Sequence, residues 1–399
     1  MLYNHIKQNI KKEKTMRRVL SLTLVLMMMV LTCACSAPSA PPEPAETSVA
    51  EPPAQAEGTP EEVQSTDAGV DFSNCSGEVV VACWAGSYME LLQKYLEPVL
   101  AEIAPNVKVV YSTGNDTDYI AKAIVEKDGV GTYDVMAIGQ MDLAKLTNNG
   151  IAKKVDDTMI PNLANMYPEY RDDYYISQMY SAGVLIYNEN MVSEAPDSWA
   201  DLWTPEYKGD VAMLSTFRHF AMFASSIIDG EEYVYGDSAD WMHGWDRIMA
   251  LKNDMDVQIL TTNEQIGNGL ATGEIAMTIG WKARAAQWVE ASDEPLAYVL
   301  PKEGSYAYIT GVSILENAPN PDAACAFVQA LLDPRVQEGF ANEMKYAPTV
   351  NNCTLTPEVQ EGISFTAQEQ ERIKMVPSSY VFDNDGVWLE RWNKEFLDQ

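Results

Sequence analysis

Compact apolar runs and helical stripes alternate along the chain from residue 78 onwards. Each run of strand type is followed by a segment with apolar residues at helical spacing, and Pro98 predicts a kink in the first such helix. The predicted strands are 78–84, 107–111, 133–139, 181–188, 274–280 and 306–316. The predicted helices are 87–103, 116–127 with Asp116 as N-cap, a short helix ending at Gly150, 281–291 and 321–332. This alternation predicts stacked α/β layers.

The N-terminus has the pattern of an export signal. Arg17 and Arg18 precede an apolar run, 19–31, that is too short to span a bilayer comfortably. We therefore predict a signal peptide over 1–34. Met16 is an alternative start, because the residues before it lie upstream of a complete signal.

The apolar run ends in LTCAC, which resembles a bacterial lipobox. Cys35 fits the lipidated position, although Thr32 stands where that box prefers leucine. Residues 36–71 contain no aromatic and no basic side chain, so they cannot bury enough apolar surface to offset the entropy of ordering. We expect 35–76 to be a lipid-anchored, disordered tether on the outer face of the bacterial cytoplasmic membrane, or facing a periplasm. An ordinary signal peptide or a poor transmembrane helix is the alternative.

Composition narrows the class of partner. The chain has 27 basic and 58 acidic residues, a net charge of −31, and the part after residue 34 carries −36. Such a surface repels nucleic acid and anionic lipid, so we expect no nucleic-acid partner and membrane contact through the lipid anchor only. The body after the tether is about twice the size of a typical domain, which predicts two lobes.

Signatures of catalysis and metal binding are missing from the sequence. It contains no GxSxG, GxxxxGK[ST], GxGxxG or CxxC motif, and only His219 and His243 follow the signal. We predict that the protein is not an enzyme and needs no cofactor or metal. Ferric iron held by Tyr174 and Tyr175 is an alternative, although such pairs more often pack.

Four cysteines follow Cys35. Cys75, Cys83, Cys325 and Cys353 could pair in an exported protein, for example the first two with each other. Cys83 and Cys325 sit in apolar segments and fit buried thiols equally well.

Three aromatic residues stand at or just past the ends of predicted strands: Trp84, Trp281 and Tyr308. Ligands collect at the carboxyl ends of strands in open α/β sheets. Each aromatic taken singly more often belongs to a core than to a site, but three in equivalent positions favour a binding site.

Long stretches of the chain resemble one bacterial family. The segments CWAGSYMELLQKYLEPVL, YDVMAIGQMDLAKLTNNGIAKKVD, IYNENMVSEAPDSWADLWTPEYKGDVAM and the whole of 280–349 occur in the order typical of that family. They are similar to the extracellular solute-binding proteins of the spermidine/putrescine type, the capture subunits of ABC importers. The resemblance covers nearly everything from Glu78 to the end.

The resemblance implies an α/β protein of two lobes joined by crossing strands, with a ligand cleft between them. Lobe 1 would comprise 77–180 and 309–350, and lobe 2 would comprise 181–308 and 351–399. A monomer would capture a small polar solute and deliver it to an ABC permease and its ATPase. An exported α/β hydrolase, a ferric-iron-binding protein of the same fold, and a lipoprotein sensor or adhesin are the alternatives.

The family's aromatic cleft positions carry over to this chain. They correspond to Trp84, Tyr88, Trp281 and Tyr308. The tyrosine that the family commonly has after the third strand falls near Gln140.

The family's acidic cleft positions do not carry over. Polyamine binders have a carboxylate where this chain has Thr310, and their acidic second-lobe loop here supplies Ser215, Thr216 and His219. Arg284 and Lys282 stand beside Trp281 and face either the ligand or solvent. Because an unpaired buried ammonium is costly, these residues favour a neutral, zwitterionic or anionic solute over a diamine.

Overall fold

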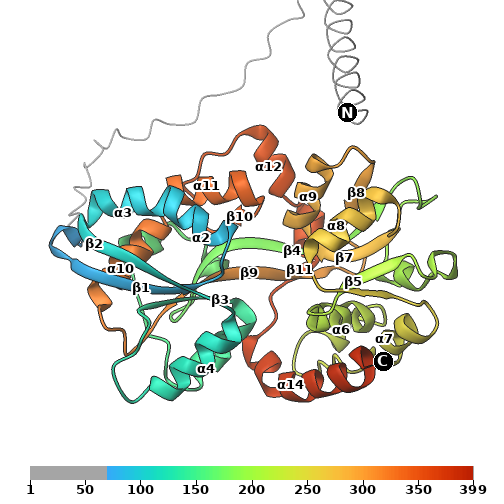
Figure 1. Cartoon of the computed structure of the whole chain (residues 1–399), viewed down its shortest axis with the longest axis horizontal. Helices are drawn as coiled ribbons and strands as arrows, with labels where there is room; N and C mark the ends of the chain where they lie inside the picture. The colour runs from blue at the N-terminus through green and yellow to red at the C-terminus, as the bar shows by residue number, and fades with distance from the viewer. Residues whose placement is uncertain (1–69, 399) are drawn as a thin grey trace, which may run out of the picture. The chain divides into compact units, whose positions relative to one another are not determined.

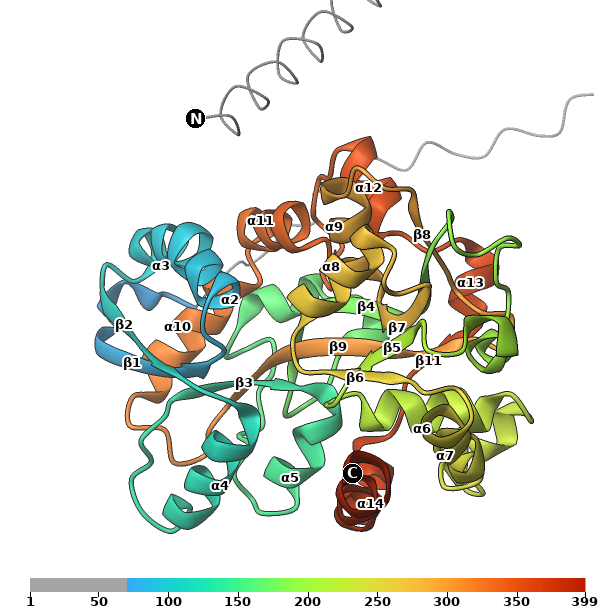
Figure 2. The same cartoon turned by 45° about the vertical axis from the view of Figure 1, so that its right-hand side comes forward.

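The computed structural model describes residues 70–398 (Figures 1 and 2). Its strands are β1 Ser76–Cys83, β2 Asn106–Thr113, β3 Val135–Gly139, β4 Ile176–Asn188, β5 Val211–Leu214, β6 Gln258–Leu260, β7 Met277–Trp281, β8 Leu296–Val299, β9 Ser305–Ile314, β10 Ala347–Pro348 and β11 Ile373–Lys374. Its α-helices are α2 Ser87–Leu91, α3 Glu97–Ile103, α4 Asp116–Glu126, α5 Leu143–Thr147, α6 Arg218–Ile227, α7 Trp245–Asn253, α8 Asn263–Thr272, α9 Lys282–Ala291, α10 Pro321–Leu331, α11 Pro334–Met344, α12 Pro357–Ile363, α13 Ala367–Glu371 and α14 Ser378–Arg391.

Short 3-10 and π segments complete the folded body. The 3-10 segments are η1 Phe72–Asn74, η3 Gln140–Asp142, η4 Pro161–Asn165, η5 Pro168–Tyr170, η6 Trp199–Trp203, η7 Pro205–Tyr207 and η8 Glu231–Tyr233, and the π segments are η2 Leu92–Leu96 and η9 Trp392–Leu397. Pro98 lies in the first turn of α3, directly after η2, so the predicted helix over 87–103 changes its winding there.

The strands pair in the order β2-β1-β3-β9-β4-β7-β5-β6. The pairs toward both ends of this order are parallel, and the three central pairs, β3–β9, β9–β4 and β4–β7, are antiparallel. β4 and β9 run side by side across the middle of the body (Figure 1). They are the crossing strands, so the prediction of two α/β lobes joined by crossing strands is confirmed.

Strands of the first lobe are apolar on both faces because helices cover both. Val79, Val81 and Cys83 of β1 pack in a core with α2, α3, α10 and α11, whereas Ala82 packs on the other side with α4 and α5. Side chains alternate between the two faces of a strand. A continuous apolar run such as EVVVAC therefore packs against the helices on both faces.

The second lobe repeats this three-layer arrangement. Leu185 of β4 and Val211 of β5 pack with α6, α7 and α14, while Val184 and Ala212 face α8 and α9. Val381 of α14 also belongs to the first of these cores. The exact residue boundaries of the lobes remain a prediction.

The predicted signal, Cys35 and most of the predicted tether lie outside the described residues. The end of the 35–76 segment is folded, because Phe72 in η1 is buried in the first lobe's core and β1 begins at Ser76. The prediction of disorder is therefore wrong for its last residues. Within 70–398, no helix is long and apolar enough to cross a membrane.

Candidate functional site

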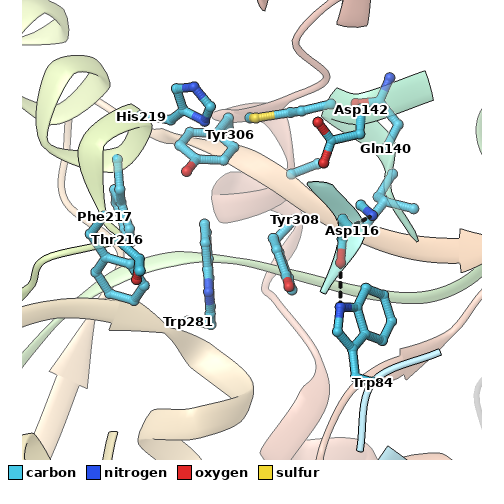
Figure 3. A pocket seen from close by; sticks show the side chains of 15 residues that line it. Trp84, Asp116, Gln140, Asp142, Thr216, Phe217, His219, Trp281, Tyr306 and Tyr308 are labelled. Atoms are coloured by element: carbon cyan, nitrogen blue, oxygen red, sulfur yellow. Dashed lines mark hydrogen bonds between the residues drawn. The ribbon is translucent and has the colours of Figure 1, made fainter. Parts of the chain in front are cut away.

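A pocket of about 220 Å³ lies between the two lobes, at the edge where several strands end (Figure 3). It is smaller than the cavities of roughly 300–1,000 Å³ that hold drug-sized ligands, so it suits a small metabolite. Six of the ten residues predicted for binding line it: Trp84, Gln140, Thr216, His219, Trp281 and Tyr308. They come from both lobes and from crossing strand β9.

Stacked aromatic rings form one wall of the pocket. The ring of Trp281, at the end of β7, lies 4.1 Å from that of Tyr308 and 4.8 Å from that of Phe220, nearly parallel to both. Figure 3 shows Trp281 and Tyr308 face to face in the middle of the site. On the first-lobe side, Trp84 packs edge-on against Tyr88 at 4.9 Å. These rings supply rigid apolar surface for an alkyl chain or a cation.

Asp116 lines the pocket, a position that the sequence pattern did not predict. It was assigned as the N-cap of the 116–127 helix, but that is wrong, because Asn115 caps α4 by accepting from the Asp118 N–H. Asp116 instead lines the pocket, where its carboxylate accepts a 2.5 Å hydrogen bond from Trp84 Nε1 and a 3.4 Å bond from the Gly139 N–H. The sequence feature that could have indicated this position is that Asp116 follows the second predicted strand, 107–111, and ligands collect at such strand ends.

The environment of Asp116 disfavours its charge. Burial and the nearby Asp142 carboxylate raise its pKa, and the two hydrogen bonds oppose that rise only in part. No lysine, arginine or histidine pairs with it in the described part of the chain. Asp116 is thus an anionic group that a bound cation would stabilise.

The other charged groups at the pocket are paired. Asp142 in η3 lies 2.6 Å from Lys145 of α5. Behind His219, Arg218 forms an ion pair with Asp385 of α14. Asp116 is therefore the carboxylate of the pocket lining without a cationic partner, counted over the described residues.

The opposite end of the pocket is the N-terminus of α6. Phe217 stands at the N-cap and has no side chain able to accept from the first N–H groups of the helix. Thr216, Phe217 and His219 line the pocket there. A helix N-terminus attracts anionic or carbonyl oxygen, and a hydroxyl and an imidazole add hydrogen-bonding groups.

Four of the ten predicted residues do not line the pocket. Tyr88 is 4% exposed and donates to Gln178 Oε1 at 2.7 Å behind Trp84. The backbone of Ser215 bonds Leu260 and the Trp392 indole.

Arg284 donates to Gln287 Oε1. The neighbouring Lys282 is buried, and its ammonium donates to the Ser364 carbonyl, so it faces neither ligand nor solvent.

Thr310 lies within crossing strand β9, between β3 and β4, and does not line the pocket. It pairs with Gly139 of β3 and with Met179 of β4, which leaves it 3% exposed, with its hydroxyl oxygen unpartnered. β3 ends opposite Thr310, so Tyr308, two residues along on the same face, stands beyond the end of β3 and reaches the pocket.

The structure also shows where the tyrosines of the iron hypothesis and the four cysteines of the disulfide hypothesis lie. Tyr175 is buried and donates to the Ile138 carbonyl, whereas Tyr174 is exposed, so their hydroxyls do not converge. Cys75, Cys83, Cys325 and Cys353 are free thiols. No cluster of three or more potential ligand side chains occurs within residues 70–398.

A family model described as "Bacterial extracellular solute-binding protein" matches residues 97–367. The spermidine/putrescine-binding periplasmic protein of Salmonella typhimurium is 27% identical over 317 residues, covering 75% of this chain and 88% of the relative.

Two solved structures resemble the fold. A structure titled as a GABA receptor superposes with a TM-score of 0.70 at 21% identity, covering 80% of this chain and 97% of that one. A spermidine/putrescine substrate-binding protein from Streptococcus pneumoniae gives a TM-score of 0.65 at 22% identity, covering 81% and 98%.

Proposed function

Because the chain belongs to the bacterial extracellular solute-binding proteins, we propose that it captures a small solute with one ammonium group and delivers it to an ABC permease. Members of this family are transport proteins, not enzymes. The cleft between the lobes is the proposed binding site, and the lobe boundaries are proposed to be those that the resemblance implies.

Asp116 is the observation that carries this proposal. Its carboxylate is raised in pKa by burial and by Asp142, and it receives only neutral donors from Trp84 and Gly139. An ammonium beside it would replace the lost hydration and remove the electrostatic penalty. The aromatic wall next to it suits the methylene chain of an amine.

The far end of the cleft favours an oxygen-bearing group on the same solute. The N–H groups at the N-terminus of α6, together with Thr216 and His219, would donate hydrogen bonds to a carboxylate or a carbonyl oxygen. A short ω-amino acid, with its ammonium at Asp116 and its carboxylate at α6, satisfies both ends. The similar fold titled as a GABA receptor supports testing 4-aminobutyrate first.

A diamine is the second candidate. Asp142 also lines the pocket, and the Salmonella typhimurium relative is named for spermidine and putrescine. Lys145 already neutralises Asp142 at 2.6 Å, so a second ammonium would have to displace that lysine. This competition is why we favour a solute with one ammonium.

Solute recognition is tested by isothermal titration of 4-aminobutyrate, putrescine, spermidine, glycine and succinate. We expect 4-aminobutyrate to bind and Asp116→Asn to weaken it about 30-fold, since losing a desolvated charge partner costs about 2 kcal/mol or more. Asp118→Asn is the control, because Asp118 is exposed two residues away. Tight succinate binding, or equal effects of the two variants, would contradict the proposal.

The pH dependence of binding gives a second readout of Asp116. Its folded-state pKa is raised, so its protonated form persists above the usual value, and an ammonium requires the ionised form. Ligand-free stability is therefore lost as pH rises through this raised pKa, while amine affinity increases over the same window. We expect affinity to fall as the pH drops through this raised pKa in the wild type, and Asp116→Asn should lack that fall.

Delivery to a permease requires the receptor to stay near the membrane. We propose that Cys35 carries lipid and that the following residues are the tether. Expression in a bacterial host with a labelled fatty acid should label the wild type but not Cys35→Ala. Label retained by that variant would move the anchor to Cys33, and an unlabelled wild type would remove the anchor.

A further inference from the structure

Asp385 is far along the chain from the residues that line the cleft, but it lies next to them in space. It sits on α14, which packs against α5 of the first lobe and beside α6 of the second (Figure 2). Its carboxylate accepts from Arg218 Nη2 and lies 2.7 Å from His219 Nε2. A further cation, Lys145 on α5 of the first lobe, lies 3.7 Å away. One carboxylate thus contacts cationic or titratable groups from both lobes.

The Asp385 side chain is ionised at neutral pH. It is only 17% exposed, and burial by itself would raise its pKa. The hydrogen bonds and charges of His219 and Arg218 outweigh that effect and hold the pKa well below its usual range. The cluster therefore keeps one full negative charge against the guanidinium of Arg218.

Arg218 would otherwise place a positive charge on the pocket wall. Its Nη2 lies 3.2 Å from Nε2 of His219, and His219 lines the pocket. Its side chain is 14% exposed, so water screens its charge poorly. With Asp385 present, this pair and the Asp142–Lys145 pair are each neutral, and the charge that remains in the lining is Asp116.

We infer that Asp385 is a specificity-determining residue, which sets the sign of the cleft's charge by masking Arg218. This inference rests on the proposed function, because it concerns the same cleft. Asp385 acts through Arg218 and His219 and needs no contact with the solute, so it is a positioning residue. Without it, the cleft admits anionic solutes and disfavours diamines.

The test compares binding of 4-aminobutyrate, putrescine and succinate to four forms of the full chain. Asp385→Asn should create measurable succinate binding and weaken putrescine about tenfold or more, whereas 4-aminobutyrate, whose carboxylate lies at the α6 end near Arg218, should bind at least as tightly as before. The double variant Arg218→Gln/Asp385→Asn removes both charges of the pair, so it should abolish the succinate binding and restore putrescine affinity to within about threefold. Asp383→Asn is the matched control, since it removes an exposed charge from the same helix.

The outcomes distinguish the masking role of Asp385 from the proposed function of the cleft. A gain of succinate binding cannot come from misfolding, and melting curves of all forms identify any unfolded variant. Absence of succinate binding in Asp385→Asn would overturn the masking role, as would succinate binding that persists in the double variant. A wild type that binds neither amine would instead contradict the proposed function, and the masking role would fall with it.

Discussion

Replacing Trp281 with alanine is expected to weaken solute binding by roughly 30- to 150-fold, equivalent to about 2–3 kcal/mol. Trp281 ends β7 and stands between Phe220 and Tyr308, with nearly parallel rings on both sides. Its removal takes away the central ring of the aromatic wall and lets water reach the site. The measurement is isothermal titration with 4-aminobutyrate, alongside a melting curve.

Trp281→Phe is the control for this prediction. A phenyl ring can still stack between Phe220 and Tyr308, so most of the affinity should remain. Full binding by Trp281→Ala would show that the solute sits elsewhere. Loss of binding together with collapse of the melting transition would assign Trp281 a structural role only.

Replacing Gly311 with alanine is expected to destabilise the fold by about 3 kcal/mol or more, at the upper end of overpacking costs. A Cβ at this position would lie 2.1 Å from the carbonyl oxygen of Ile176 and 2.9 Å from the Cα of Ser177. Those atoms belong to β4, which pairs with β9 at the crossing between the lobes. Because the obstacle is backbone, the crossing strands themselves would have to move apart.

A melting curve checks the Gly311 prediction, and the expected drop is about 5 °C or more. Gly362→Ala in α12 is the control, because a Cβ there meets no atom within 4 Å. That variant should melt at or slightly above the wild-type temperature, since alanine favours a helix. Equal melting of the two variants would show that β4 and β9 can separate without cost.

Local patterns in the sequence were enough to predict the layers of the fold. The run over 78–84 became β1, and 306–316 became β9, because a strand between two helical layers must be apolar on both faces. The same patterns located the ends of β1 and β7, so the positions of Trp84 and Trp281 at one pocket followed from their places in the sequence. Tyr308 is not at a strand end as predicted, because it lies inside β9 and reaches the pocket where β3 ends. β4 was predicted too short, since its start at Ile176 depends on pairing with β9.

The charges of the cleft depend on contacts that no local pattern records. Asn115 and Asp116 are both acceptable helix caps by residue type, and only the fold decides that Asn115 caps α4 and Asp116 turns toward Trp84. Asp385 meets Arg218 across 167 residues of sequence. Such pairs form when separate elements pack, so the sequence carries no spacing that predicts them.

The sequence by itself therefore determined the alternation of strands and helices in the segments that it resolved and the aromatic residues Trp84 and Trp281 at strand ends, because periodicity and strand ends are local properties. Only the tertiary structure decided which polar groups line the pocket. Thr310 was expected in the cleft, but pairing with β3 and β4 on both sides keeps it buried. Whether a polar side chain on a strand is buried or faces the pocket depends on how far the neighbouring strands extend beside it. The extent of those strands is fixed by long-range packing.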